Sequence, residues 1–160
     1  MIKFYYEKLD NNLKNELLKI IEVSKEEVYG NKKNKALYNS LNENYNDLNW
    51  QHYLALQEKG LLVLATMRDD GKLVGYYAAS CYYHNQSKGL FCAYVEHVHV
   101  LKEYRKDKNA IKLINFAEEK LKKLGVKSMT WGINPKLGTD KLLNYLGWSV
   151  DEVIFSKELI

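Results

Sequence analysis

Residues 94–114 read YVEHVHVLKEYRKDKNAIKLI. In this stretch Val98 and Val100 alternate with polar residues as in a half-buried strand, and from Ala110 onward the apolar spacing is that of a helix. A short charged turn separates the two. The stretch therefore predicts a strand, a turn and a helix in direct succession. Such a junction suits a phosphate or diphosphate, because the first helical turn points unpaired N–H groups outward with the positive end of the helix dipole behind them.

Two apolar runs lie before this junction, at residues 61–67 and 73–83. The five residues between them carry an Asp-Gly pair, Asp70-Gly71, which is a strong turn signal. The two runs therefore predict an antiparallel hairpin, and the strand of the junction, residues 90–101, follows it as a third strand. Gly75 falls inside the second run, where a glycine marks a bulge or a close approach of backbone.

The other expected elements flank these strands. Before the hairpin we expect a strand over 2–8, a helix over 13–23, an Asn-rich polar connection over 30–49 and a helix over 48–58; after the junction strand we expect a helix over 106–124, a strand over 126–133, a helix over 139–146 and a closing strand, bent or split, over 148–159.

The composition is that of an ordinary soluble globular protein. Of the 160 residues, 46% are hydrophobic and 28% are charged, so we expect one domain over residues 1–160. No apolar run approaches the roughly 20 residues that span a bilayer, and the N-terminus lacks a signal-peptide pattern. The sequence therefore predicts a cytoplasmic protein without a membrane partner.

The charge pattern argues against nucleic acid as a partner. The net charge is +4, and its lysines are spread along the chain among acidic residues. Only Arg68 and Arg105 are arginines, whereas a nucleic-acid-binding surface usually clusters its charge and uses arginine.

The cysteine and histidine spacing predicts no metal site. Cys81 and Cys92 stand on neighbouring expected strands and read as two buried free thiols. His97 and His99 share one strand face, but a zinc site would need a third ligand from elsewhere.

The junction resembles the signature of the Gcn5-related N-acetyltransferase (GNAT) superfamily. That signature is a strand ending in Val, a few residues, then Arg or Gln, two residues, Gly, one residue, and Gly or Ala opening a helix. Val100 matches the strand-end Val, Arg105 the Arg or Gln, and Ala110 the closing Gly or Ala. Lys108 stands where the family usually has its first Gly, and no Pro follows the strand.

The order of expected elements is similar to that of the same superfamily over the whole chain. The hairpin sequence at residues 70–76 and Leu146-Gly147-Trp148 add short matches. The resemblance implies an α/β (α+β) fold whose mixed, mostly antiparallel central sheet splays between strands 90–101 and 126–133. The chain looks most like small acetyltransferase-like proteins encoded by bacteriophages.

The resemblance implies acetyl-CoA as the co-substrate and no metal. In the superfamily the pantetheine arm lies between the two splayed strands, and the diphosphate lies at the start of the following helix. By position, the cofactor-binding residues would be Val98, His99 and Val100 for pantetheine, Arg105, Lys106, Asp107, Lys108, Asn109 and Ala110 for the diphosphate, and Asn134 in the loop after strand 126–133, with Lys106, Lys108 or Lys112 meeting the outer phosphate.

Glu96 is the candidate general base. Acetyl transfer needs a neutral amine, so a base must take a proton near pH 7. Relatives that resemble spermidine acetyltransferases carry a Glu at this position, and alternation places Glu96 on one strand face with Tyr94, Val98 and Val100. A bulge in this strand would make His97 or His99 a rival base. A salt-bridged or edge-exposed Glu96 remains the alternative.

The family's frequent general acid is absent. It is a Tyr four residues before the glycine that ends the last helix, and that position is Leu143 here. Tyr145 is two residues away and so turned by about 200° around the helix. Together with Lys108, this departure leaves open a non-catalytic binding or assembly module.

The enzymatic reading implies an amine as the partner, either a small molecule or a peptide. Residues 30–49, with Tyr38 and Tyr45, and Trp50 after them would recognise part of it. The resemblance also allows a homodimer, since many relatives dimerise.

Overall fold

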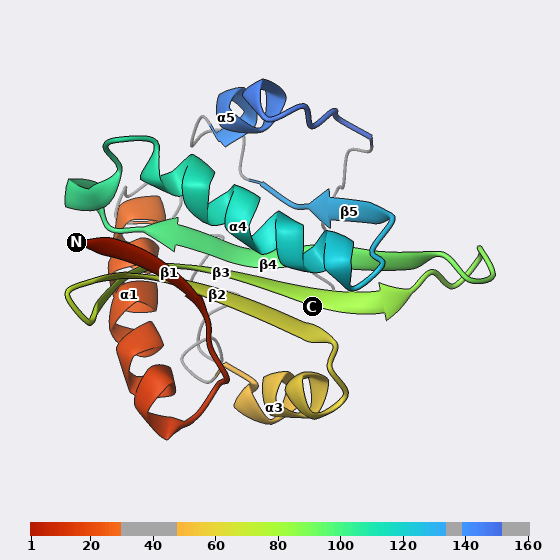
Figure 1. The fold of residues 1–160 in the computed structure, drawn as a ribbon, viewed down its shortest axis with the longest axis horizontal. Helices are drawn as coiled ribbons and strands as arrows, with labels where there is room; N and C mark the ends of the chain where they lie inside the picture. Colours follow the sequence, from red (N-terminus) through yellow and green to blue (C-terminus); the bar gives the residue numbers. More distant parts are fainter. Residues whose placement is uncertain (30–47, 134–138, 152–160) are drawn as a thin grey trace, which may run out of the picture.

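A single open sheet organises the molecule. The computed structural model describes residues 1–29, 48–133 and 139–151 of the chain. The sheet has the order β1-β2-β3-β4-β5, with antiparallel pairing up to β4 and a parallel pair of β4 with β5 (Figure 1). Its strands are β1 Ile2–Tyr6, β2 Leu62–Asp69, β3 Lys72–Tyr83, β4 Phe91–Val100 and β5 Ser128–Trp131.

Helices cover both faces of the sheet. Helices α1 and α3 lie on one face and α4 and α5 on the other; in Figure 1, α3 lies below the strands and α5 above them. The helices are α1 Asn11–Tyr29, α3 Trp50–Glu58, α4 Asn109–Lys123 and α5 Thr139–Tyr145, with a short 3-10 turn, η1, at Lys102–Tyr104. We call these two surfaces of the sheet the α1/α3 face and the α4 face.

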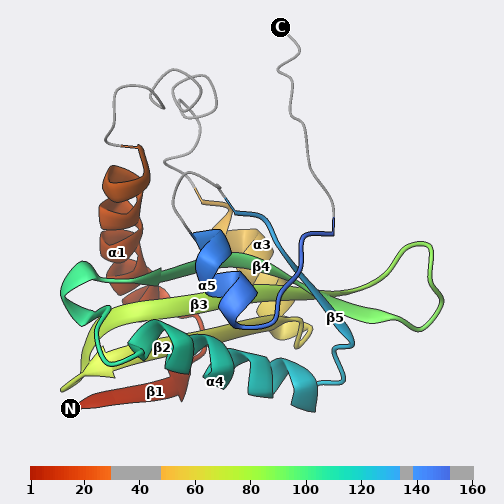
Figure 2. The ribbon, with the colours of Figure 1, turned by 90° about the horizontal axis from the view of Figure 1, so that it is seen from above.

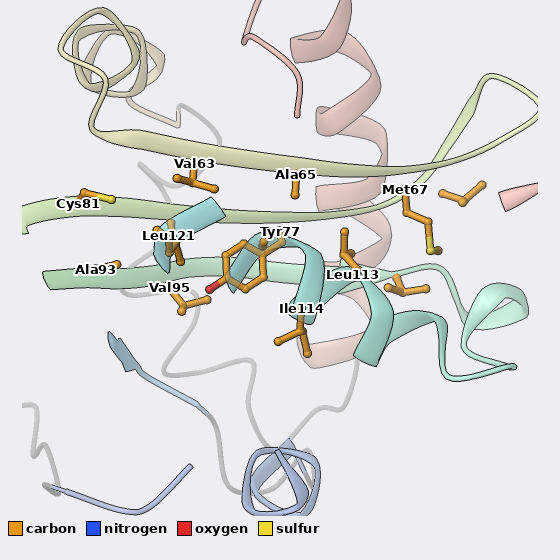
Figure 3. Close-up of a cluster of buried hydrophobic side chains, with 14 residues drawn as sticks. Val63, Ala65, Met67, Tyr77, Cys81, Ala93, Val95, Leu113, Ile114 and Leu121 are labelled. Atoms are coloured by element: carbon orange, nitrogen blue, oxygen red, sulfur yellow. The ribbon is translucent and has the colours of Figure 1, made fainter. Parts of the chain in front are cut away.

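The core on the α4 face is the larger of two buried clusters. Residues of β2, β3 and β4 pack there against one stripe of α4 formed by Leu113, Ile114, Ala117 and Leu121 (Figure 3). This 1-4-8 spacing places the four side chains on one side of a helix. Because both faces of β3 are covered, its sequence is a nearly continuous apolar run rather than an alternating one.

The central strands follow the sequence prediction closely. The hairpin of β2 and β3 turns at Asp70 and Gly71, both of which have positive φ. The register of β2 and β3 shifts between Met67 and Arg68, next to Gly75. A Cβ on Gly75 would lie 3.0 Å from the carbonyl oxygen of His99, so the predicted bulge and close approach are both confirmed.

The long hairpin of β3 and β4 extends beyond the other strands (Figure 2). The ends of several other elements differ from the prediction. Helix α1 runs six residues beyond the expected end at Val23, and α4 begins at Asn109 rather than Lys106.

The expected closing strand is not seen where the structure describes it, since residues 148–151 form no strand. Residues 152–159 of that strand, and the expected connection up to residue 47, lie outside the described residues. Within the described ranges, no helix is both long and apolar enough to cross a lipid bilayer.

Candidate functional site

Strand β4 carries a bulge at Glu96. His97 pairs with Ala78 of β3, but the next pair joins Val95 to Ala79, so Glu96 has no opposite residue. Ala78 belongs to the cluster under α1 and α3, whereas Ala79 and Val95 belong to the core under α4. The extra residue therefore breaks the two-residue period of the strand at this point.

The bulge places Glu96 on a different strand face from the one that alternation predicted. The Ser80 hydroxyl donates a hydrogen bond to Glu96 Oε1 at 2.5 Å, and Ser80 pairs with Tyr94. Val98, by contrast, pairs with Tyr77 on the α4 face. The expectation that Glu96 shares a face with Val98 and Val100 was wrong, because alternation counted across a bulge assigns the wrong side.

The bulge also brings His97 beside Glu96 on the α1/α3 face. Its Nδ1 lies 2.7 Å from the Tyr76 hydroxyl, and the two rings stack with centroids 5.2 Å apart. Burial, reinforced by the nearby His99, lowers the pKa of His97 to about 4. His97 is therefore a neutral imidazole at pH 7.

His99 lies deeper on the same face, opposite Tyr76. It is 8% exposed, and its Nε2 is buried without a hydrogen-bond partner among the described residues. Burial lowers the pKa of His99, and the positive charge of Arg105 lowers it further. His99 is too enclosed to meet a substrate directly.

The loop between β4 and α4 keeps a glycine-like backbone without a glycine. Asp107 has φ 54° and Lys108 has φ 58° and ψ 26°, both in the left-handed region that Gly adopts most readily. The sequence led us to expect a helical Lys108. Because these two residues are left-handed instead of helical, α4 begins only at Asn109.

The same loop presents free backbone donors. Among hydrogen bonds within the described ranges, none uses the N–H of Asp107, Lys108 or Ala110. The buried Asn109 donates from Nδ2 to the Tyr104 carbonyl at 3.1 Å, which fixes the loop from inside. Donors at a helix N-terminus with the dipole behind them favour an anion.

Arg105 points away from these donors. Its Nε donates to the Val100 carbonyl at 2.7 Å, and its guanidinium forms an ion pair with Glu27 in α1. The side chain therefore closes the end of β4 against α1. Its predicted contact with a phosphate stays a prediction, as do the roles of Lys106 and Asp107, which are exposed.

The sheet splays where the sequence predicts. β5 pairs with β4 only from Cys92 to Val95, and Trp131 is its last residue. Beyond Val95, the β4 edge that carries Val98 and Val100 has no strand beside it within the described ranges. Asn134, predicted to contact the cofactor, lies outside the described residues.

The α5 position expected for a general acid holds an apolar side chain. Leu143 is 7% exposed, whereas Tyr145 is 69% exposed. No phenol of α5 therefore points into the molecule.

Sequence reasoning missed Tyr76 and Ser80, the two β3 partners of the bulge. Both fall on one face by alternation, but nothing in the sequence gives the register that joins them to His97 and Glu96.

Sequence reasoning also missed a second polar cluster in the α4 core, where Tyr77 Oη and Glu118 Oε1 are buried without a described partner. Burial raises the pKa of Glu118, against the effect of a hydrogen bond with Trp148.

A family model supports the reading of the junction. The model of the acetyltransferase (GNAT) family matches residues 19–142, well over half of the chain. The chain belongs to the acetyltransferase (GNAT) family. The match covers the bulge, the loop and α4, and it extends from within α1 into α5. No curated protein sequence matches the chain, and the comparisons give no support to the narrower likeness to bacteriophage proteins.

Several solved structures are similar to this architecture. Glucosamine-6-phosphate N-acetyltransferase from Arabidopsis thaliana is 13% identical with a TM-score of 0.71, over 100% of this chain and 99% of that one. The protein AAC(6')-Iy, in complex with a CoA bisubstrate analogue, is 16% identical with a TM-score of 0.64, over 100% of this chain and 99% of that one. A transcriptional regulator from Bacillus halodurans is 10% identical with a TM-score of 0.71, over 99% and 100%. At these identities the likeness shows the GNAT fold alone.

The structure offers no ready metal centre in its described part. No group of three His, Cys, Asp or Glu residues there could hold a metal ion. Cys81 and Cys92 are both buried free thiols.

Proposed function

We propose that this GNAT protein is an acetyl-CoA-dependent N-acetyltransferase that uses Glu96 as the general base. One observation carries the proposal: the β4 bulge turns Glu96 toward the α1/α3 face, where the Ser80 hydroxyl orients its carboxylate. A base held by a neighbouring hydrogen bond beside the splayed edge is what acetyl transfer to an amine requires.

The loop and the splayed edge fit coenzyme A. The free N–H groups of Asp107, Lys108 and Ala110 would hold its diphosphate, and the β4 edge at Val98, His99 and Val100, which β5 does not pair with, would hold its pantetheine arm. The left-handed conformation at Lys108 keeps those amides in a glycine-like arrangement despite the missing glycine. Acetyl-CoA supplies an activated thioester to whatever amine is bound beside it.

Glu96 would act on the acceptor amine. Its carboxylate accepts a proton from the ammonium, directly or through one water, so that the nitrogen lone pair becomes free to attack the acetyl carbonyl. The hydrogen bond from Ser80 holds one carboxylate oxygen, which leaves the other for this task. Since α5 offers Leu143 and no inward phenol, the departing thiolate would take its proton from water.

The acceptor is a small-molecule or peptide amine. Trp50 stands at the start of α3, where its ring makes a cation–π contact with Lys14. It packs against the hydrophobic cluster of the α1/α3 face. This face is the side from which we expect the amine to approach Glu96. A homodimer and a cytoplasmic location, with no nucleic acid or membrane partner, belong to the same proposal.

A non-catalytic binding or assembly module is the second candidate. Lys108 in place of glycine and Leu143 in place of tyrosine favour it. The module would keep the fold with or without coenzyme A, so turnover is the property that separates the two candidates.

Two measurements on the full chain test the proposal. Calorimetry with acetyl-CoA reports binding, and thiol release on a panel of a polyamine, an amino sugar, an amino acid and a short peptide reports turnover. We expect Glu96→Gln to keep acetyl-CoA affinity and to lower kcat by about 10²-fold or more, within the usual range for a lost general base. The matched control is Glu58→Gln, an exposed residue of α3. Binding without turnover on any amine would favour the module, and full activity of Glu96→Gln would reject the base.

A further inference from the structure

Tyr76 and His97 are joined across β3 and β4 by their side chains. The Tyr76 hydroxyl lies 2.7 Å from His97 Nδ1, and the rings are stacked with an angle of 6° between their planes. Tyr76 is 3% exposed. The contact therefore fixes the imidazole in one orientation as well as pairing it.

The phenol must be the donor in this pair. Burial raises the pKa of Tyr76 far above its usual range, so its hydroxyl keeps its proton. Within the described part of the chain, His97 Nδ1 is the one hydrogen-bond partner of that hydroxyl. If Nδ1 carried a proton instead, the buried phenol hydrogen would face it without an acceptor, which costs about 1–3 kcal/mol.

This donor leaves the imidazole proton on Nε2. A neutral imidazole carries one N–H, and when Nδ1 accepts from Tyr76 the N–H is at Nε2. The low pKa of His97 keeps the ring neutral across the physiological range. With its Nδ1 lone pair engaged and its Nε2 protonated, His97 has no free site to accept a proton.

The titratable and polar groups around His97 agree with this state. Glu96 and Ser80 lie beside it on the α1/α3 face, His99 follows it on the strand, and Tyr53 of α3 lies near Tyr76. His97 Nε2 differs from His99 Nε2, because only the latter is fully buried without a partner in the described ranges. The N–H of His97 is thus the donor that the bulge offers beside Glu96.

We propose that His97 is a neutral hydrogen-bond donor to the acetyl carbonyl oxygen through Nε2–H, and that Tyr76 is the positioning residue that selects this tautomer. The inference rests on the proposed function. Glu96 takes the proton of the amine, the amine nitrogen bonds to the carbonyl carbon, and the C=O electron pair moves onto the oxygen facing His97. No proton leaves His97. The carbon–sulfur bond then breaks, the C=O bond re-forms, and the second proton of the amine nitrogen passes through water to the departing thiolate.

The tautomer is measurable without any turnover. Long-range proton–nitrogen NMR on the ¹⁵N-labelled full chain identifies which ring nitrogen of His97 is protonated. We expect the Nε2–H form from pH 8 down to about pH 5, and a mixture of both forms in Tyr76→Phe. Tyr77→Phe is the matched control, because the Tyr77 hydroxyl lies on the other face without a described partner. A protonated Nδ1 in the unaltered protein would overturn the inference.

Two substitutions of His97 separate a donor from a base. Glutamine offers an N–H but cannot take a proton at pH 7, and methionine offers neither. We expect kcat to fall by about 10²-fold in His97→Met, as for other lost oxyanion donors, and by no more than about tenfold in His97→Gln, with KM nearly unchanged. Thermal melts check that both variants fold.

The outcomes distinguish this inference from the proposed function. Equal losses in His97→Gln and His97→Met, with turnover intact in the parent, would overturn the donor role alone. Absence of turnover on every amine would overturn the proposed function and the donor role together, whatever the tautomer.

Discussion

Arg105 forms an ion pair with Glu27, which joins the β4–α4 loop to the C-terminal part of α1. The same guanidinium donates from Nε to the Val100 carbonyl at 2.7 Å and so also holds the end of β4. The two residues are 78 positions apart in the sequence. The arginine that the family signature assigns to this loop is therefore already paired with a carboxylate.

Glu27→Gln should strengthen coenzyme A binding. A diphosphate that draws on Arg105 must compete with Glu27, and removing that charge ends the competition. Because an exposed ion pair contributes about 0–1 kcal/mol, we expect the Kd for CoA to fall by roughly two- to fivefold at low salt. Calorimetry would measure it, with the exposed neighbour Glu26→Gln as the control. A weaker affinity in Glu27→Gln would show that the pair supports the loop instead.

Lys108→Gly should stabilise the protein. The left-handed backbone at Lys108 costs a residue with a Cβ about 1 kcal/mol, and Gly avoids this cost. We expect a gain of about 1 kcal/mol in the free energy of unfolding, measured by denaturant titration. Lys108→Ala is the control, since it removes the same charge but keeps the Cβ. Equal effects of the two variants would mean that charge, and not backbone strain, decides the result.

Glu118→Gln should stabilise the protein at high pH and not at low pH. The folded-state pKa of Glu118 is raised, mainly by burial, above its ordinary value of 4.5. The stability that Glu118 contributes is therefore fully present below about pH 4.5 and is lost as the pH rises through the folded-state pKa. We expect the melting temperature of Glu118→Gln to exceed that of the parent by about 2 °C at pH 8, and the difference to vanish by pH 4.

The exposed neighbour Glu119→Gln controls for the loss of a negative charge on α4. A difference between Glu118→Gln and the parent that stays constant from pH 4 to pH 8 would contradict the buried carboxyl.

Gly75→Ala should destabilise the protein. A Cβ at this position would lie 3.0 Å from the His99 carbonyl oxygen and 3.1 Å from Val100 Cγ2, and the first of these is backbone that cannot swing aside. We expect a loss of about 1–3 kcal/mol, as for other overpacked positions, measured by thermal or denaturant unfolding. An unchanged stability would mean that β3 and β4 can separate locally near Gly75.

The sequence predicted what depends on local pattern. The Asp-Gly turn located the hairpin, and the apolar spacing after Ala110 located α4, because these signals lie within a few residues of each other. The strand–turn–helix junction followed from the same local signals, whereas the splay between β4 and β5 was implied by the resemblance to the GNAT superfamily.

What the sequence could not predict depends on distant partners or on unfavourable local states. The face of Glu96 is set by its pairing with β3, and the bulge that changes it has no signature in β4 alone. The contact of Tyr76 with His97 spans 21 positions. Lys108 was expected to be helical because a lysine rarely adopts positive φ, and the surrounding loop overrides that preference.

The bulge also separates the β4 residues that pack in the core from the β4 residues that we assign to the site. Val95 and Val98 stay in register with β3 and fill the α4 core, while the extra residue between them leaves positions 96 and 97 free of that core. Substitutions there can change the reactive groups of the site without repacking the core under α4. Over evolutionary time, such a strand can gain or lose its chemistry while that core remains unaltered.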